Sequence, residues 1–443
     1  MLLLVGVTAL SFFHEVGPQD ITRLALTEAI TLDRSLRIDR WQAQTPDKAL
    51  YDGHYYSDKA PGMSFLAVPG YVLLRSAGVQ RGENELAGVW KDRSDVWLLR
   101  VLAGGLGFLA AVFLVGRVAE GIEEGTGASA ATAFGLGTLA LPLAPTMFGH
   151  LAAAALGFAA FVAVWSGCRA DRGRELRWAA GGLCAGLAVL TEYQAVFIAA
   201  VLLVYLATRA VRAAIVYAAA AVPCVVALAL YNTAAFDSPW RLSYRYVSEE
   251  FAGEQAKGFF GISVPDPGQL ARILFTWDGL LLRSPVLVFA GAGLVLLWRK
   301  GVRSEAAVCG TVVLLFLAVN AGYYDPLGGG SPGPRFFVPA LPFLAVGLAC
   351  SYRRWPFATL AATVVSVGFM MYRAGTWFWT DEESFVTVWS LLGSPGIAGV
   401  LVSAALALAA LILGAREVLA ADPGATARLR HRFPRGPMSL DDV

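Results

Sequence analysis

Two polar clusters near the start of the chain contain residue types suited to acid–base chemistry and phosphate binding. The first cluster is the segment 14–30, HEVGPQDITRLALTEAI, which follows an apolar run. Asp20 lies in front of a helical pattern of apolar residues. Its carboxylate could cap that helix by accepting hydrogen bonds from first-turn amides, or it could act as a general base. The two roles are compatible, and Glu15 and Glu28 are alternative carboxylates.

The second cluster is the segment 51–65, YDGHYYSDKAPGMSF, whose Gly and Pro residues predict a loop. Between the first Gly and the Pro-Gly pair stand five chemically useful side chains: His54, Tyr55, Tyr56, Asp58 and Lys59. The lysine could hold a phosphate as a point charge, or it could extend to lipid headgroups. The tyrosine pair could contact a ligand or anchor the chain at a membrane interface.

The composition indicates which elements must position these residues. The chain has 443 residues, of which 57% are hydrophobic and 15% charged, with a formal net charge of +2. Soluble domains have roughly 45–50% apolar and about 25% charged residues. The mean hydropathy is +0.59. These values exclude a water-soluble enzyme, a disordered chain and a collagen, and the near-zero net charge argues against a nucleic-acid partner. They predict an integral membrane protein.

Long runs of Ala, Leu, Val and Gly without period-2 alternation predict transmembrane helices rather than a β-barrel. They lie at 2–13, 62–76, 95–118, 128–145, 150–168, 178–191, 193–208, 213–233, 285–298, 305–322, 336–350, 355–373 and 396–414. The first run is short and lacks a preceding positive segment, so we expect no cleaved signal peptide, although the natural start could lie upstream. The run 62–76, with Pro69 and Gly70, is predicted to be interfacial or re-entrant. About twelve spans remain.

Short basic loops predict which ends of the helices face the cytoplasm. The loops 169–177, 209–212, 299–303 and 353–354 fall on one side when each remaining run crosses once. The turn 119–127 is predicted to lie on this side too, although it is acidic. The transmembrane domain is expected over 1–415 and a basic cytoplasmic tail over 416–443. The opposite, outer side receives a large first loop, 14–94, a second large loop, 234–284, and the segments 323–335 and 374–395.

The motifs of the two outer clusters resemble those of a known superfamily. Asp20 follows the first span, and Lys59 with Pro61 opens an interfacial helix. The segment 320–344, NAGYYDPLGGGSPGPRFFVPALPFL, resembles a Gly-Pro-Arg motif and proline-rich helix start of bacterial relatives. The chain thus resembles the GT-C membrane glycosyltransferases, in particular the branch of the protein O-mannosyltransferases and the lipid A aminoarabinose transferase. Two positions depart from the usual pattern, Ile21 and Ala60.

The resemblance implies an all-α GT-C-like protein that transfers a sugar from a polyprenyl-phosphate donor at the outer face of the cytoplasmic membrane. The acceptor would be a glycan, a lipid or a protein, and one direct displacement would invert the anomeric carbon. Such a reaction needs a base for the acceptor hydroxyl, for which Asp20 is the candidate. It also needs cations for the departing phosphate, and the candidates are Lys59, Arg100, Arg241, Arg245, Arg283 and Arg335.

Most of these arginines also have an alternative role. Arg335 follows a Gly-rich loop and could instead anchor the protein to headgroups, and Arg283 lies at the same predicted outer face. Arg241 and Arg245 would share one helix face at i,i+4 and could simply be solvated. Arg100 lies inside a predicted span, so it must pair with either a phosphate or an acid.

Three more polar residues stand at predicted outer helix ends or turns. His150 could contact the sugar or phosphate, or it could be a hydrogen-bonded structural residue. Glu192 could bind a sugar hydroxyl or pair with an arginine such as Arg100. Asp325 could contact the sugar, or it could form an ordinary Asp-Pro turn. The aromatic and acidic segment 376–385 could stack on carbohydrate or lie in an interfacial tryptophan belt.

Two other classes of membrane protein stay open as alternatives. A transporter or lipid flippase would have charged residues deep in several spans, whereas here most charges lie at outer helix ends. A non-catalytic scaffold would not need the charged first loop. We expect no cofactor and no tight metal site, with a divalent cation near Asp20 left open. No disulfides are expected, because the five cysteines stand in or beside apolar runs without a CxxC motif: Cys168, Cys184, Cys224, Cys309 and Cys350.

Overall fold

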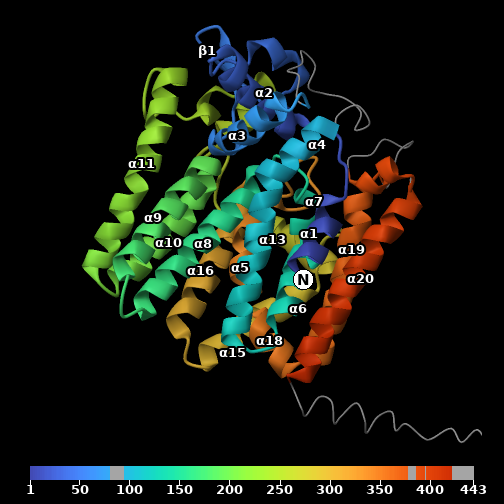
Figure 1. Cartoon of the computed structure of the whole chain (residues 1–443). Helices are drawn as coiled ribbons and strands as arrows, with labels where there is room; N and C mark the ends of the chain where they lie inside the picture. Colours follow the sequence, from blue (N-terminus) through green and yellow to red (C-terminus); the bar gives the residue numbers. More distant parts are fainter. Residues whose placement is uncertain (80–93, 378–385, 395, 422–443) are drawn as a thin grey trace, which may run out of the picture.

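The computed structural model describes residues 1–79, 94–377, 386–394 and 396–421, and it is 74% helical (Figure 1). Within these residues six helical segments are long and apolar enough to cross a membrane. They are α4 to α5 (Asp95–Ile122, with α5 at Leu106–Ile122), α8 (Gly149–Arg169), α11 (Val211–Phe236), α16 (Arg303–Gly322), α19 (Pro356–Thr376) and α20 (Ile397–Ala420).

Two further segments pass the same test only as bent pairs. The first joins Pro267–Arg283 to Val286–Arg299 at 92°, and the second joins Arg335–Ala345 to Leu348–Arg354 at 54°. Their parts are α13 (Pro267–Phe275), α14 (Leu280–Arg283), α15 (Val286–Arg299), η7 (Arg335–Ala340), α17 (Leu341–Ala345) and α18 (Leu348–Arg354). The described residues therefore support six to eight spans, and the expected count of about twelve is not confirmed.

Several runs predicted to span form short or broken helices. The run 128–145 is split into α6 (Gly127–Gly137) and α7 (Ala140–Leu143) by Thr138, whose hydroxyl accepts a hydrogen bond from Ala140 N. The other short helices are α1 (Leu2–Leu10) and α10 (Val196–Ala207), whereas α9 (Arg174–Thr191) has 18 residues but carries Arg174, Glu175 and Arg177 at its start. Small residues let α6 pack on α5, α19 and α20 with its sequence from Ser129 to Gly137 fully buried. Burial in protein rather than in lipid is what permits such irregular helices.

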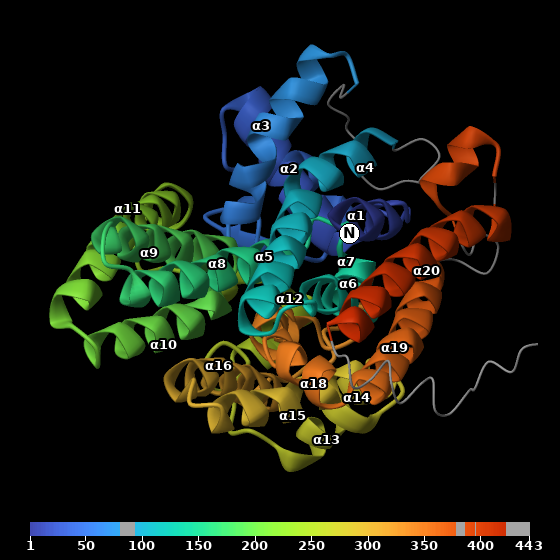
Figure 2. The ribbon, with the colours of Figure 1, turned by 60° about the horizontal axis from the view of Figure 1, so that its bottom comes forward.

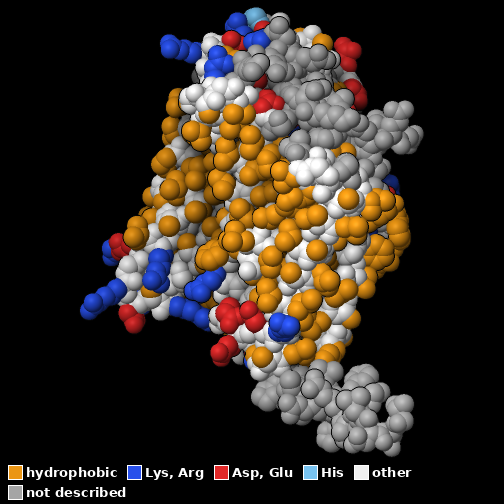
Figure 3. Space-filling view, turned by 45° about the vertical axis from the view of Figure 1, so that its right-hand side comes forward, with side chains coloured by type: hydrophobic (Ala, Val, Ile, Leu, Met, Phe, Trp, Pro, Cys, Tyr) orange, Lys and Arg blue, Asp and Glu red, His pale blue; other side chains and the backbone are white. Residues whose placement is uncertain are grey.

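The apolar surface of the bundle lies between two polar ends (Figure 3). In the most apolar windows of α11 and α20 only 22% and 28% of residues are buried inside the protein. The exposed side chains of these helices are mostly Val, Leu and Ile. A continuous apolar face of this kind is the surface that a membrane covers, in agreement with the predicted class.

The predicted cytoplasmic loops meet at one end of the bundle. Arg212 pairs with Glu175 over 2.5 Å and Arg209 with Glu305 over 3.5 Å. Glu123 of the acidic turn pairs with both Lys300 and Arg353. These contacts confirm that the acidic turn shares an end with the basic loops. Of its acidic residues, Glu123 pairs with the cations of that end, while Glu120 accepts hydrogen bonds from the Gly125 and Gly127 amides of the turn.

The first loop folds over the other end of the bundle (Figures 1 and 2). It contains α2 (Pro18–Glu28), α3 (Gly62–Ser76) and a hairpin of β1 (Ala49–Tyr51) and β2 (His54–Tyr56), paired Ala49 to Tyr56. Short turns of η1 (Ala29–Asp33) and η2 (Asp39–Gln44) connect them. Asp52 and Gly53 have φ of 49° and 75°, the left-handed values of a two-residue hairpin turn. At 15 residues α3 is not among the six long apolar segments; it contains Pro69 and packs on α2, with further contacts to α4 and α9.

The second outer loop packs against the first. It holds η6 (Ser243–Tyr246), α12 (Glu249–Gln255) and the start of α13. Ser243 Oγ donates to the Asp58 carbonyl over 2.7 Å, and Ser248 N donates to the Lys48 carbonyl over 3.0 Å. The two loops thus form one polar layer over the helix ends.

The remaining elements are α4 (Ser94–Arg100), η4 (Val101–Gly105), η5 (Tyr193–Ala195) and η8 (Val388–Leu392).

Candidate functional site

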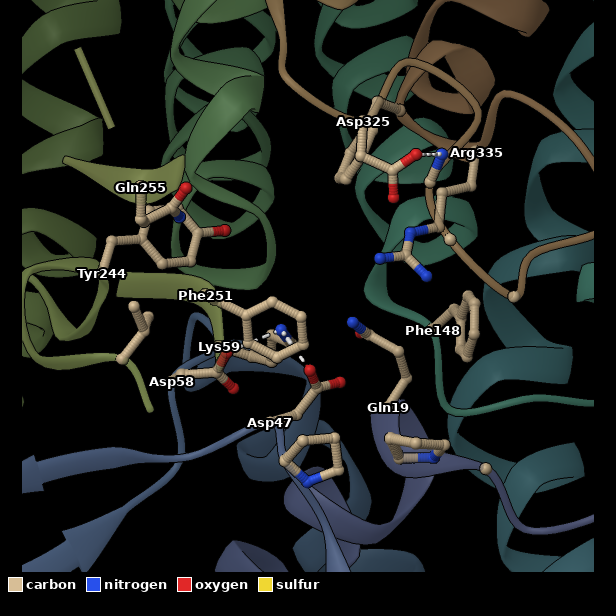
Figure 4. A pocket seen from close by; sticks show the side chains of 18 of the residues that line it. Gln19, Asp47, Asp58, Lys59, Phe148, Tyr244, Phe251, Gln255, Asp325 and Arg335 are labelled. Carbon is tan, nitrogen blue, oxygen red and sulfur yellow. Dashed lines mark hydrogen bonds and ion pairs between the residues drawn. The ribbon is translucent and has the colours of Figure 1, made fainter. Parts of the chain in front are cut away.

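A cavity of about 360 Å3 lies in this polar layer. Six separate segments line it, and Figure 4 shows side chains from several of them converging on a common space. The segments are the start of α2 with Gln19 and Arg23, the loop before α3 with Asp47, Asp58 and Lys59, the start of α8 with Phe148 and His150, Glu192 at the end of α9, the stretch from Tyr244 to Gln255, and the loop from Tyr323 to Phe336.

Lys59 is one of three cations that line the cavity among the described residues, together with Arg335 and the deeply buried Arg23. Its Nζ lies 2.7 Å from Asp58 Oδ2 and 3.2 Å from Asp47 Oδ1 (Figure 4). Burial lowers the pKa of Lys59, but the two carboxylates outweigh burial and leave that pKa raised. Burial raises the pKa of Asp58 to about 6, although the positive charge of Lys59 opposes the rise. The cluster therefore carries a firmly charged lysine beside a carboxyl that titrates near neutrality.

Arg335 is a second cation of the cavity, and it lies at the start of η7 after the Gly-rich loop. Its guanidinium carbon lies 5.4 Å from the ring centre of Phe148 and 5.0 Å from that of Phe336. Among the described residues, no carboxylate lies within ion-pair distance of this guanidinium. Figure 4 shows the side chain pointing into the cavity. A cation without a carboxylate partner, held between aromatic rings, is well suited to bind an anion.

The loop that carries Arg335 is fixed by side chains from behind. Arg283 donates to the Pro332 carbonyl over 3.1 Å and pairs with Asp278 over 2.5 Å. Arg373 donates to the same carbonyl over 3.2 Å, and Trp377 Nε1 donates to the Gly330 carbonyl over 2.7 Å. Arg283 therefore lies outside the cavity. It supports the loop instead of facing a phosphate, because the Pro332 carbonyl and the Asp278 carboxylate already accept hydrogen bonds from its guanidinium.

The turn before Arg335 depends on local chemistry that the sequence displays. Gly328 N donates to both the backbone and side-chain oxygens of Asp325, at 3.1 and 3.2 Å. Gly328 and Gly329 have φ of 82° and 62°, where other residues would be strained. Asp325 lines the cavity as predicted, so it serves both as the turn residue and as a cavity carboxylate.

A buried group of polar residues forms another wall of the cavity. Glu192 Oε1 accepts a hydrogen bond from Arg23 over 2.7 Å and lies 3.6 Å from His150 Nδ1. The side chains of Arg23 and His150 are 1% and 2% exposed. Burial raises the pKa of Glu192, with Arg23, Lys59 and Arg335 opposing that rise. Glu192 does pair with an arginine, but with Arg23 rather than Arg100.

Asp20 and Arg100 form a separate pair that does not line the cavity. Arg100 Nη2 donates to Asp20 Oδ2 over 2.8 Å, and Met147 N donates to Asp20 Oδ1 over 2.6 Å. Arg100 also donates to the carbonyls of His14 and Glu15. Of the two roles predicted for Arg100, the structure shows pairing with an acid. Asp20 is the third residue of α2, whose N-cap is Gly17, so it does not cap that helix as the sequence suggested; its side chain accepts a hydrogen bond from Met147 N instead.

The hairpin and the second loop hold the predicted residues that do not line the cavity. His54 pairs with Asp39 over 2.8 Å, and Lys48 lies over the Tyr55 ring. Tyr56 packs on Phe236 with ring centres 5.3 Å apart. Each of these side chains already contacts a neighbouring residue outside the cavity: His54 contacts Asp39, Tyr55 contacts Lys48, and Tyr56 contacts Phe236. They therefore act in packing or at the surface.

Arg241 and Arg245 also lie outside the cavity. Arg241 donates to Tyr51 Oη over 2.6 Å and to the Phe236 carbonyl over 3.0 Å, while Arg245 is exposed. The expected helix with both arginines on one face is a single 3₁₀ turn, Ser243–Tyr246. That turn directs the intervening Tyr244 to the cavity.

Sequence reasoning missed several residues that line the cavity. They are Gln19, Arg23, Asp47, Phe148, Tyr244, Glu250, Gln255, Tyr323 and Phe336. Arg23 carried a usable signal, because a charged residue on a mostly apolar helix next to Asp20 must find a partner. The predicted aromatic segment 376–385 lies outside the described residues from 378 onwards.

The chain was compared with known proteins. No protein-family model and no curated protein sequence matches it. Among solved structures it resembles ArnT from Cupriavidus metallidurans bound to undecaprenyl phosphate, with 16% identity over 94% of this chain and 76% of that chain, at a TM-score of 0.50. The apo form of the same ArnT gives 18% identity over 94% and 75% of the two chains, at 0.49.

A third structure is the oligosaccharyltransferase of Archaeoglobus fulgidus in its apo form. It shares 13% identity over 98% of this chain and 58% of that chain, at a TM-score of 0.47. ArnT, a lipid A aminoarabinose transferase, and this oligosaccharyltransferase are GT-C membrane glycosyltransferases. The likeness to lipid-bound ArnT extends over almost the whole of the present chain. The chain therefore has the GT-C fold, as its motifs predicted.

Proposed function

We propose that this protein is a membrane glycosyltransferase that moves a sugar from a polyprenyl-phosphate donor to an acceptor hydroxyl, inverting the anomeric carbon. The observation that carries the proposal is the pair of cations, Lys59 and Arg335, that face one cavity in the polar layer. A departing lipid phosphate carries the negative charge that such cations stabilise in the transition state. The fold of lipid-bound ArnT supports the same class of donor.

An apolar pocket beside the cavity gives the lipid chain a place to lie. It has a volume of about 120 Å3 and lies between the starts of η5 and α10 and the end of α16, with Phe197, Phe259 and Phe260 among its lining residues. It shares Glu192, Tyr244, Tyr323 and Phe336 with the cavity. A phosphate in the cavity could therefore continue into an isoprenoid tail between two apolar helices without burying polar atoms against it.

The sugar would occupy the part of the cavity lined by aromatic and carboxyl groups. Tyr244, Phe251 and Tyr324 offer ring faces, and Asp325 and Glu250 offer acceptors for hydroxyl groups. This mixture is typical of small-ligand sites with a few placed polar groups. We propose that the site faces the outer side of the cytoplasmic membrane, because the basic loops lie at the opposite end of the bundle.

The geometry gives little support to Asp20 as the general base that the sequence suggested. Asp20 remains the residue that matches the family motif, but both of its oxygens already accept hydrogen bonds. It also does not line the cavity. In this proposal Asp20 holds the first loop to Arg100 and to the turn before α8. The group that accepts the proton is then one of the residues that line the cavity.

The alternative of a transporter or flippase finds less support. Its hallmark would be ionisable residues facing a path through the middle of the spans. Here the cations of interest gather at one end, where an aqueous acceptor and a lipid-borne donor can meet. The alternative would be favoured if the protein bound undecaprenyl phosphate and moved it between leaflets without any sugar transfer.

The test begins with binding. Purified protein in nanodiscs should bind undecaprenyl phosphate, measured by a ligand-induced rise in melting temperature and by native mass spectrometry. It should then release polyprenyl phosphate from a radiolabelled polyprenyl-phosphate sugar when membrane extracts supply acceptors. Absence of binding to the wild-type protein would refute the donor class. Binding without transfer or donor hydrolysis under any acceptor condition would refute the enzyme.

A further inference from the structure

His150 is the most unusual polar side chain in the cavity wall. It is the second residue of α8, and its side chain is 2% exposed. Both ring nitrogens are buried without a hydrogen-bond partner among the described residues. A buried imidazole with two unused nitrogens is costly. In a ligand cavity, that cost indicates that a bound molecule completes the hydrogen bonding.

A carboxylate lies near one ring nitrogen of His150, at ion-pair rather than hydrogen-bond distance. Glu192 Oε1 lies 3.6 Å from Nδ1, and Arg23 holds that carboxylate from the other side over 2.7 Å. A carboxylate beside one ring nitrogen leaves the other nitrogen to receive a proton and stabilises the imidazolium that forms. The charged groups that face the ring are Glu192, Arg23, Lys59 and Arg335.

The ring also lies next to the proposed phosphate site. His150 lies between Phe148 and Phe336, with ring centres 6.1 and 5.6 Å away. The same two rings flank the Arg335 guanidinium, at 5.4 and 5.0 Å. A phosphate on Arg335 would therefore hold the sugar's anomeric carbon near the histidine. An acceptor hydroxyl attacking that carbon would come within its reach.

We propose that His150 accepts the proton of the acceptor hydroxyl, with Glu192 as its positioning residue. This inference rests on the proposed transferase function and adds the residue that removes the proton. In the step, the acceptor oxygen forms a bond to the anomeric carbon and its proton passes to the free ring nitrogen of His150. The bond from that carbon to the phosphate oxygen breaks, and its electron pair stays on the phosphate. Lys59 and Arg335 hold the phosphate that leaves.

The first experiment compares transfer by His150→Gln with transfer by His54→Gln. Gln keeps a polar side chain of similar reach but cannot accept the proton, and His54 supplies a matched histidine outside the cavity. Transfer by H150Q should fall on the order of 10²-fold or more, while H54Q should stay near the wild-type rate. Melting temperatures of both variants check folding. If folded H150Q transfers sugar at the wild-type rate, the inference is overturned.

The role of Glu192 is tested through the pH profile rather than the rate alone. Glu192→Gln removes the charge that stabilises the imidazolium, so the acidic limb of the transfer profile should move to lower pH. A residue that only supports the fold would lower the rate or the melting temperature and leave the limb in place. An unmoved limb in E192Q would overturn the positioning role.

The second experiment needs no acceptor. Undecaprenyl phosphate resembles the product that leaves while His150 is protonated, so its binding should be linked to proton uptake at this residue. Between about pH 5 and 8 wild-type affinity should fall more steeply with rising pH than that of H150Q, by up to about tenfold per pH unit for one linked proton. The titration of the phosphate itself is common to both proteins. Parallel curves would overturn the inference while leaving the donor class intact, whereas no binding to wild type would overturn both.

Discussion

Arg100 and Asp20 form an ion pair of 2.8 Å in which the two side chains are 2% and 3% exposed. The pair joins the long helix after the first loop to the first helix of that loop. Arg100 has two further acceptors in the carbonyls of His14 and Glu15. The pair therefore fixes where the chain leaves α1 and enters the outer layer. It makes Asp20 a structural anchor whose loss would be felt as instability.

Asp20→Asn separates this anchoring role from that of a general base. Removing one charge of a buried pair costs about 3 kcal/mol or more, because Arg100 would be left uncompensated. We expect a lower melting temperature and less than a tenfold loss of transfer per folded molecule. A base would behave in the opposite way, with an unchanged melting temperature and about 10²-fold slower transfer. Melting curves and transfer rates on the same preparations decide between the two.

Lys59→Ala and Arg335→Ala test the phosphate site. Each removes one charge-assisted contact, worth roughly 1.5–3 kcal/mol. The affinity for undecaprenyl phosphate should fall on the order of 10- to 150-fold. Arg245→Ala is the matched control, because Arg245 is exposed and lies outside the cavity. Equal affinities for all three variants would show that Lys59 and Arg335 do not bind the donor phosphate and would favour their alternative role as anchors to lipid headgroups.

Arg283→Met tests whether the loop before Arg335 needs its support. Met keeps much of the side-chain volume but cannot donate to the Pro332 carbonyl. Donor affinity should fall by less than in Arg335→Ala, since the cation stays and only its position loosens. Arg272→Met on α13, where the exposed arginine donates to Gln269 Oε1 and lies outside the cavity, is the control. No difference between the two Met variants would show that Arg373 and Trp377 hold the loop without Arg283.

The pKa of Asp58, raised by burial to about 6 from 3.8, predicts a pH-dependent stability. Between about pH 4 and 6 the folded protein holds a proton that the unfolded chain has lost. This group's contribution to the free energy of unfolding therefore falls as pH rises through that window and is constant above it. Asp58→Asn removes the titration. The melting temperature of D58N minus that of wild type should be larger at pH 7 than at pH 4.5, and an equal difference at both would contradict the raised pKa.

The sidedness of the bundle can be checked by labelling. A cysteine at position 257 should react with an impermeant thiol reagent on intact cells, and one at position 172 should not, in a background without the native cysteines. Lys257 and Arg172 are both exposed and lie at opposite polar ends. The reverse pattern would place the cavity on the cytoplasmic side and remove the proposed outer face.

The sequence alone determined the class of this protein, because composition and the length of apolar runs depend on nothing but the order of residues. The helical class follows from the cost of unpaired backbone in lipid. The polar cluster with Lys59 and the segment with Arg335 could also be identified from the order of residues alone. Each is a local pattern of turn residues and cations. The prediction that the basic loops lie at one end of the bundle followed from the number of Lys and Arg residues in each short loop.

Which of these residues share a site depends on how the helices pack against one another. Arg23 and Glu192 are 169 positions apart, and Asp20 and Arg100 are 80 apart, yet each pair is in contact. No local pattern states which arginine meets which acid, so the sequence could offer Arg100 to Glu192 as readily as to Asp20. A buried charge must be paired, but burial and partner are set by how the helices pack. That packing removed Asp20 from the cavity and placed His150 beside Glu192 in its wall.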